Sequence, residues 1–231
     1  MKTQKFYINN IPALAVGEKT DKVFLFIHGK MGCKEEAIAF ADVVCEKGFQ
    51  VIAIDLPEHG ERKNEVIPLY PWTVIPELCG VINYLKENYK EISIRANSIG
   101  AWFSIMAFQN ERIKKALFVS PILDMNILIK NMMLLAGVTE QQLRKQGEIK
   151  TNFGETLSWR YYAYVKEHPI LNWNTQTYIL YADKDNLIDR TTVDRFISAH
   201  YCDLTVIKNG EHWFHTDEQL EFLKNWENIV T

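Results

Sequence analysis

The chain has 231 residues, 47% of them hydrophobic, and its 26 Lys and Arg residues stand against 29 Asp and Glu residues for a formal net charge of −3. This length and apolar content suit one globular domain with a sizeable core. Neither sign of charge forms a long block, which argues against a nucleic-acid-binding arm. The N-terminus lacks the apolar run of a signal peptide, and no stretch approaches the roughly 20 apolar residues that cross a bilayer. We therefore expect a soluble cytoplasmic protein that binds neither membranes nor nucleic acids.

The first quarter of the chain begins with the pattern of a β-hairpin. Two segments, Lys5 to Ile8 and Ile11 to Val16, flank a turn at Asn9-Asn10. The apolar run Val23 to Ile27 follows, which is typical of a strand buried on both faces. Apolar residues at helical spacing then predict a helix from Lys34 to Glu46.

Strands alternate with helices along the rest of the chain. The expected strands are 51–54, 92–96, 116–119, 178–181 and 204–207, and the expected helices are 72–89, 99–109, 189–199 and 216–229. This alternation predicts an α/β fold with a mostly parallel central sheet and helices on both faces.

One long connection interrupts the alternation. Roughly 55 residues separate Ser120-Pro121 from the next expected strand, far more than the ~12–15 residues at which an unstructured loop becomes uncommon. Its apolar and aromatic residues indicate short helices with an apolar face. We therefore expect a single domain, residues 1–231, with a helical lid inserted at approximately 122–175; an ordinary surface excursion is the alternative.

The stretch RANSIG, residues 95–100, places Ser98 between a predicted strand and a predicted helix. Small residues, Ala96 and Gly100, stand two positions before and after it. This spacing is that of a nucleophile elbow, in which a strand turns so sharply into a helix that the serine oxygen stands clear of both. An ordinary tight turn is the alternative.

Other residues suited to acyl transfer also follow predicted strands. Asp183 and Asp185 follow the strand at 178–181, and His212 follows the strand at 204–207. Ligands of parallel α/β sheets bind at the carboxyl ends of the strands. A serine hydroxyl needs a base, and the base needs a carboxylate to orient it, so these residue types point to a Ser-His-Asp triad.

The order Ser, Asp, His resembles that of the α/β-hydrolase superfamily. Two further segments carry the resemblance: His28-Gly29, which ends a buried strand, and Asp55 to Gly60, DLPEHG, which is similar to the superfamily's D-x-P-G-H-G segment. The resemblance extends from about Val23 to the C-terminus, apart from the lid. It implies the α/β-hydrolase fold with a small helical cap, and an oxyanion hole made by the backbone N–H groups of Lys30 and Ile99.

Two positions of the triad have competitors. Asp185 matches the superfamily's G-x-x-D pattern, with alanine in place of the glycine, while Asp183 and Asp124 are alternative acids. His212 is the expected base, and His215 is the alternative. The latter precedes a capping box that Thr216 and Gln219 predict at the start of the last helix, which favours a structural role for it. We expect His28 and His59 to order loops through hydrogen bonds.

No cofactor or metal site is expected. The cysteines are scattered, with no C-x-x-C pair and no metal-ligand spacing, and neither a P-loop nor a strand-linked G-x-G-x-x-G motif occurs.

We therefore expect a serine hydrolase that cleaves a small carboxylic ester, or an amide or thioester, through an acyl-enzyme. Its partner is a small acyl substrate. Acyl transfer to an alcohol or amine by the same triad, and a catalytically retired binding protein, are the alternatives. The oligomeric state is not predicted.

Overall fold

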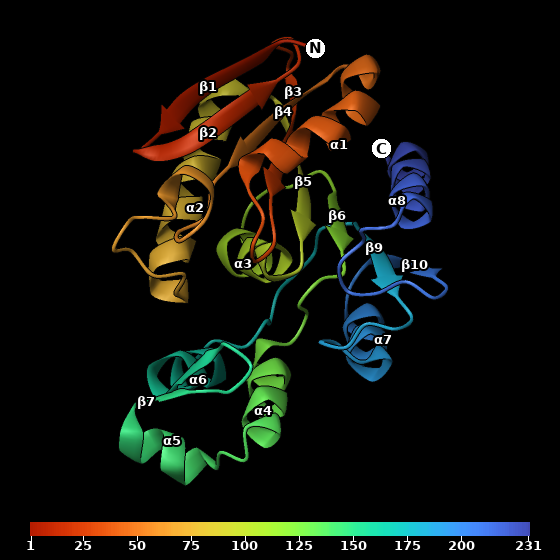
Figure 1. Ribbon diagram of the computed structural model, residues 1–231. Helices are drawn as coiled ribbons and strands as arrows, with labels where there is room; N and C mark the ends of the chain where they lie inside the picture. The colour runs from red at the N-terminus through yellow and green to blue at the C-terminus, as the bar shows by residue number, and fades with distance from the viewer.

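The computed structural model describes all residues from Met1 to Thr231, and an eight-stranded sheet runs through its centre (Figure 1). The strand order is β1-β2-β4-β3-β5-β6-β9-β10; β2 is antiparallel to both of its neighbours, and all other pairs are parallel. The strands are β1 (Thr3–Ile8), β2 (Ile11–Val16), β3 (Lys22–Ile27), β4 (Phe49–Ile54), β5 (Glu91–Asn97), β6 (Ala116–Val119), β9 (Thr177–Ala182) and β10 (Cys202–Ile207).

The apolar runs of the sequence form the middle of this sheet. Every residue of β4 and β6 is buried, and so is all of β3 after Lys22. The predicted hairpin is also present, because Asn9 and Asn10 both have positive φ angles, 49° and 70°, as the tight turn between β1 and β2 requires. The hairpin forms one edge of the sheet.

Helices cover both faces of the sheet. Phe24 and Phe26 of β3 face α1 and α8, whereas Val23, Leu25 and Ile27 face α2, α3 and α7. The helices are α1 (Ala37–Val44), α2 (Pro71–Asn88), α3 (Ile99–Phe108), α7 (Arg190–Ala199) and α8 (Asp217–Val230), with short 3-10 turns at Lys34–Glu36, Cys45–Lys47 and Gly60–Arg62. The fold is therefore α/β, as the alternation of strands and helices predicted.

The helix predicted at 34–46 is regular only in its middle. The N–H of Lys34 donates to the carboxylate of Asp55, and the N–H of Cys33 donates to Glu36. These side-chain acceptors hold the first turn in a 3-10 conformation. At the other end, Gly48 has a φ of 83° and ends the segment, since this left-handed conformation favours glycine.

The segment between β6 and β9 contains three helices and a small hairpin. It lies below the sheet in Figure 1 and comprises α4 (Met125–Leu135), α5 (Glu140–Gln146), β7 (Glu148–Lys150), β8 (Thr156–Ser158) and α6 (Trp159–Glu167). We call residues 122–175 the insertion. Sequence reasoning predicted its helices but not the β7–β8 hairpin. The apolar side chains of Met125, Ile129, Tyr162 and Val165 belong to the same core as α2 and α3.

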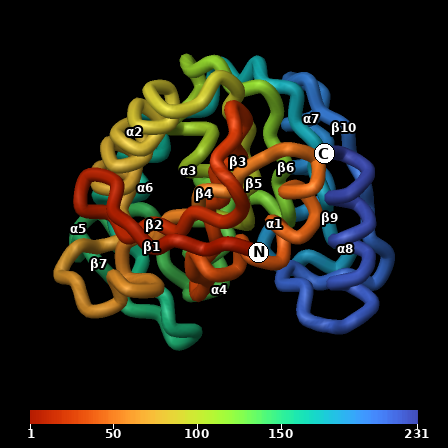
Figure 2. The backbone as a smooth tube through the Cα atoms, turned by 90° about the horizontal axis from the view of Figure 1, so that it is seen from above, coloured from red at the N-terminus to blue at the C-terminus, as the bar shows by residue number.

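Seen from above, α2, α5 and α6 lie on one side of the molecule, and α7 and α8 lie on the other (Figure 2). None of the helices combines the length and the apolar character needed to span a membrane.

Candidate active site

Ser98 occupies a strained turn between β5 and α3. Its φ and ψ angles are 48° and −118°, outside the regions that a serine ordinarily adopts. The helix lies very close to the strands here: a Cβ atom added to Gly100 would lie 2.5 Å from the carbonyl oxygen of His28. Only glycine fits at that position. The local geometry is that of a nucleophile elbow, with the small residue required at the expected place.

Ser98, His212 and Asp185 form a hydrogen-bonded chain. The Oγ atom of Ser98 lies 2.8 Å from Nε2 of His212, and Nδ1 of His212 lies 2.7 Å from Oδ2 of Asp185. A carboxylate only accepts hydrogen bonds, so the proton of the neutral ring is on Nδ1. The lone pair of Nε2 therefore faces the serine hydroxyl, as a base for that hydroxyl requires.

The carboxylate of Asp185 is fixed from several sides. Its side chain is fully buried, whereas that of His212 is 15% exposed. Its Oδ1 atom accepts the N–H groups of Leu187 and Ile188, at 2.8 and 3.0 Å. Because three donors hold the carboxylate, the orientation of the imidazole is fixed as well.

The alternative acids and base lie elsewhere. Asp183 is exposed. Asp124 caps α4 by accepting the N–H of Ile127 at 3.0 Å. The exposed His215 lies within 3.0 Å of the carbonyl oxygen of Trp213 and precedes the predicted capping box, which is present. The structure therefore brings Ser98, Asp185 and His212 together. Asp183, Asp124 and His215 take no part in this chain of hydrogen bonds.

The loop after β3 lies against the serine. A Cβ atom added to Gly29 would lie 3.2 Å from Cβ of Ser98, so the next residue, Lys30, is beside the elbow. The N–H of Lys30 donates no hydrogen bond within the protein. Ile99 is the first residue of α3, so its N–H has no acceptor within the helix. Both amides that the sequence analysis selected are thus near Ser98 and free of a helix or strand partner.

Solved structures with the same architecture extend over almost the whole chain. One is Est1E from Butyrivibrio proteoclasticus, solved with ferulic acid bound: the match covers 98% of this chain and 97% of that one, with a TM-score of 0.77 and 18% identity. Another is the alpha/beta hydrolase domain-containing protein 10 from mouse, with 100% and 98% coverage, a TM-score of 0.78 and 13% identity. The Pyrococcus furiosus esterase Pf2001 matches at 99% and 89% coverage, a TM-score of 0.66 and 16% identity. The chain has the α/β-hydrolase fold. No protein-family model and no curated protein matches the sequence.

One buried ion pair lies beside the elbow of this α/β-hydrolase fold. Arg95 of β5 and Glu227 of α8 are 2% and 5% exposed and meet at 2.7 Å. Burial raises the pKa of the Glu227 carboxyl, and the adjacent guanidinium opposes this rise. Arg95 also donates to the side chain of Asn97, the residue before Ser98. The C-terminal helix is thereby connected to the turn that holds the serine.

The side chain of Lys30 forms an ion pair with Glu155, in the turn between β7 and β8 of the insertion. The loop beside Ser98 is therefore in contact with the insertion. Sequence reasoning missed this contact, because 125 positions separate the two residues and nothing local relates them.

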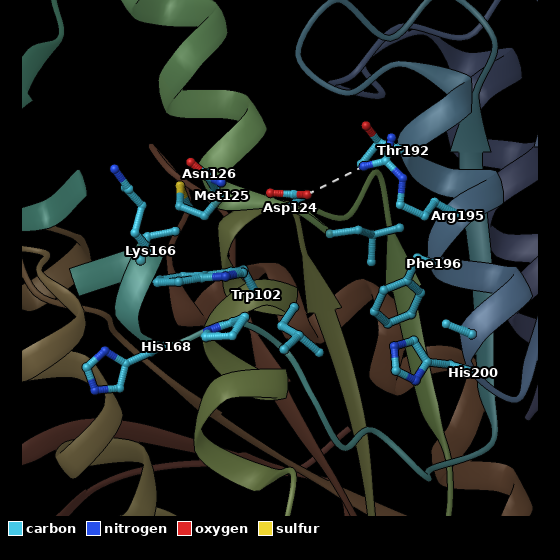
Figure 3. A pocket seen from close by; sticks show the side chains of 15 residues that line it. Trp102, Asp124, Met125, Asn126, Lys166, His168, Thr192, Arg195, Phe196 and His200 are labelled. Atoms are coloured by element: carbon cyan, nitrogen blue, oxygen red, sulfur yellow. Dashed lines mark ion pairs between the residues drawn. The ribbon is translucent and has the colours of Figure 1, made fainter. Parts of the chain in front are cut away.

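A pocket of about 280 Å³ opens between the core and the insertion of the α/β-hydrolase fold (Figure 3). Apolar side chains such as Trp102, Val165 and Phe196 form part of its wall, and polar side chains, including the ion pair of Asp124 and Arg195, form another part. Trp102 lies one helical turn after Ser98, and α7 begins five residues after Asp185. Ser98, Asp185 and His212 are not themselves among the residues that line the pocket.

No group of three or more His, Cys, Asp or Glu side chains is arranged to hold a metal ion, and all four cysteines are free thiols.

Proposed function

We propose that the chain is a serine hydrolase that cleaves a small carboxylic ester through an acyl-enzyme intermediate. The observation that carries this proposal is the chain of hydrogen bonds from Ser98 Oγ through His212 to the buried carboxylate of Asp185. A serine that is merely a turn residue needs neither a base at 2.8 Å nor a strained backbone.

In the proposed reaction, Ser98 Oγ attacks the ester carbonyl while its proton passes to Nε2 of His212. Asp185 remains ionised and stabilises the imidazolium. The carbonyl oxygen becomes an oxyanion, which the N–H groups of Lys30 and Ile99 stabilise. When the C–O bond breaks, His212 returns the proton to the leaving alcohol. Water then attacks the acyl-enzyme with His212 again as base, which releases the carboxylic acid and restores Ser98.

We assign the acyl group to the pocket between the core and the insertion. Its volume of about 280 Å³ is just below the range of about 300–1,000 Å³ that is usual for ligand pockets, so it suits an acyl group no larger than a substituted ring. Aromatic walls such as Trp102 and Phe196 favour a planar acyl group. Est1E, a structural neighbour, was solved with ferulic acid, which is a substituted aromatic acid. Aromatic carboxylic esters are therefore our first choice of substrate.

The insertion acts as a lid in this proposal. It supplies one side of the pocket through Met125 and Val165, and its β7–β8 hairpin contacts the loop after β3 at the ion pair of Lys30 and Glu155. Such a lid limits the size of the substrate.

The test is hydrolysis of p-nitrophenyl acetate, butyrate and benzoate by the wild-type protein and by Ser98→Ala, with fluorophosphonate labelling of both. Ser104→Ala is a matched control, because Ser104 is a buried serine of the same helix that donates to the carbonyl of Gly100. We expect turnover and labelling in the wild type and in Ser104→Ala, and neither in Ser98→Ala. Equal behaviour of all three proteins would refute the proposal.

A further inference from the structure

Two loops at the carboxyl edge of the sheet are joined by hydrogen bonds from the backbone of each loop to a histidine of the other. We call residues 28–33, after β3, the first loop and residues 55–60, after β4, the second loop. His28 of the first loop accepts the N–H of Leu56 at 3.0 Å through its Nε2 atom. In return, Nε2 of His59, in the second loop, accepts the N–H of Met31 at 2.8 Å. We call this reciprocal pair of hydrogen bonds the histidine clasp.

Both rings of the clasp are neutral and have the same tautomer. Nδ1 of His28 lies 2.7 Å from the carbonyl oxygen of Gly29, and Nδ1 of His59 lies 2.7 Å from that of Pro57. A carbonyl oxygen only accepts, so each Nδ1 carries the proton and each Nε2 offers its lone pair to a backbone N–H. The rings are 0% and 8% exposed, so water does not compete for these bonds.

The clasp holds the two peptide groups on either side of Lys30. The carbonyl that His28 holds belongs to the Gly29–Lys30 peptide, whose N–H is that of Lys30. In a trans peptide the C=O and N–H point in opposite directions, so fixing the Gly29 oxygen also fixes the direction of the Lys30 N–H. His59 holds the next peptide through Met31, which has an unfavourable φ of 68°. The Gly29 oxygen also accepts the N–H of Gly32 at 3.2 Å, so the clasp acts together with this turn; the Met31 N–H is held by His59.

We propose that His28 and His59 are positioning residues that aim the Lys30 N–H at the oxyanion formed on the substrate bound to Ser98. This inference rests on the proposed function. The side chains of His28 and His59 form their hydrogen bonds with backbone groups of the two loops and not with Ser98, so they act through the backbone of the first loop, which lies against Ser98. The second loop, whose sequence is DLPEHG, supplies no reacting group in the proposed chemistry. Through His59 it nevertheless contributes to the position of the Lys30 N–H.

The test compares His59→Gln with His59→Asn. A glutamine carboxamide extends to about the place of Nε2 and can still accept the Met31 N–H, whereas asparagine is one methylene shorter and cannot reach it. Loss of an oxyanion-hole donor lowers kcat by roughly 100- to 1,000-fold, so a misdirected donor in His59→Asn should lower kcat by about 10- to 100-fold. We expect KM to stay within about threefold and His59→Gln to retain most of the activity.

Two readouts separate positioning from a general loss of stability. A phenylboronic acid forms a tetrahedral adduct with an activated serine, so its affinity should fall in His59→Asn by the same factor as kcat, while the fluorescence-monitored unfolding midpoint of both variants stays similar. The amide of Met31 should exchange slowly in the wild type and faster in His59→Asn. The exchange measurement on the wild type remains decisive if His59→Asn does not fold, because an unprotected Met31 amide would overturn the clasp.

The outcomes distinguish this inference from the proposed function. A wild-type protein that neither hydrolyses esters nor reacts with a fluorophosphonate overturns both. An active wild type whose His59→Asn and His59→Gln variants have equal kcat, or whose loss of kcat comes with unchanged boronic acid affinity, overturns the clasp alone.

Discussion

The neutral state of His28 predicts a loss of stability in acid. Burial lowers the pKa of this histidine from 6.5 to about 4, and the carbonyl of Gly29 partly opposes that effect. Of the ionisable groups near the ring, His59 and Lys34 lower the pKa of His28 and Asp55 raises it. In the unfolded chain the ring regains an ordinary pKa near 6.5.

Proton linkage gives the direction and the size of this change in the free energy of unfolding. Between pH 6.5 and about 4 the unfolded chain binds a proton that folded His28 does not, so the free energy of unfolding falls as the pH is lowered through this window. The full effect of this pKa difference is roughly 3 kcal/mol, and about 2 kcal/mol of it is lost between pH 7 and pH 5. That is a large share of the ~5–15 kcal/mol by which domains are stable.

The assay is urea unfolding at pH 7 and pH 5, for the wild type and His28→Gln. Glutamine can accept the Leu56 N–H but does not titrate, so the contributions of other groups cancel when the two proteins are compared. The wild type should lose about 2 kcal/mol more than the variant over this interval. Equal losses would show that His28 takes up its proton in the folded protein as readily as in the unfolded chain, which would refute the argument from burial.

Three further predictions concern the elbow and the residues around it. Asp185→Asn should lower kcat about 10,000-fold with little change in the unfolding midpoint, because an amide stabilises the wrong tautomer of the imidazole. Arg95→Met should cost about 3–5 kcal/mol in urea unfolding by leaving Glu227 buried and unpaired, and adding Glu227→Leu should recover most of it; a larger cost in the double variant would contradict this. Gly100→Ala should lower both stability and kcat, because its Cβ would lie 2.5 Å from the His28 carbonyl oxygen; a variant with wild-type calorimetric and kinetic behaviour would contradict the close approach.

The sequence was most informative where a structural requirement is local. The position of Ser98 follows from small residues two positions away on either side, since strand and helix must pass closely there. The α/β fold was predicted correctly from buried apolar runs alternating with helical patterns. For the acid, the motif offered both Asp183 and Asp185, and the structure brings Asp185 to His212 because the loop after β9 buries that carboxylate against two backbone N–H groups.

Other features were beyond sequence reasoning because they depend on side-chain direction and distant contacts. The strands β7 and β8 have three residues each, too few for an alternating pattern to be recognised. The partners of His28 and His59 could not be assigned, although hydrogen bonds from them were expected. The contact between Lys30 and Glu155 joins segments that only the folded chain brings together. The catalytic roles of the triad and of the oxyanion amides remain predictions.

The shared apolar core resists movement of the insertion as a whole. Swinging the whole insertion away would expose Met125, Ile129, Tyr162 and Val165 to water, at about 25 cal/mol for each Å² of apolar surface. The tip of the β7–β8 hairpin is attached far more weakly, since an exposed ion pair such as Lys30–Glu155 contributes about 1 kcal/mol or less. Salt, which screens that ion pair, therefore loosens the contact between the hairpin tip and the loop after β3 and leaves the apolar core of the insertion intact.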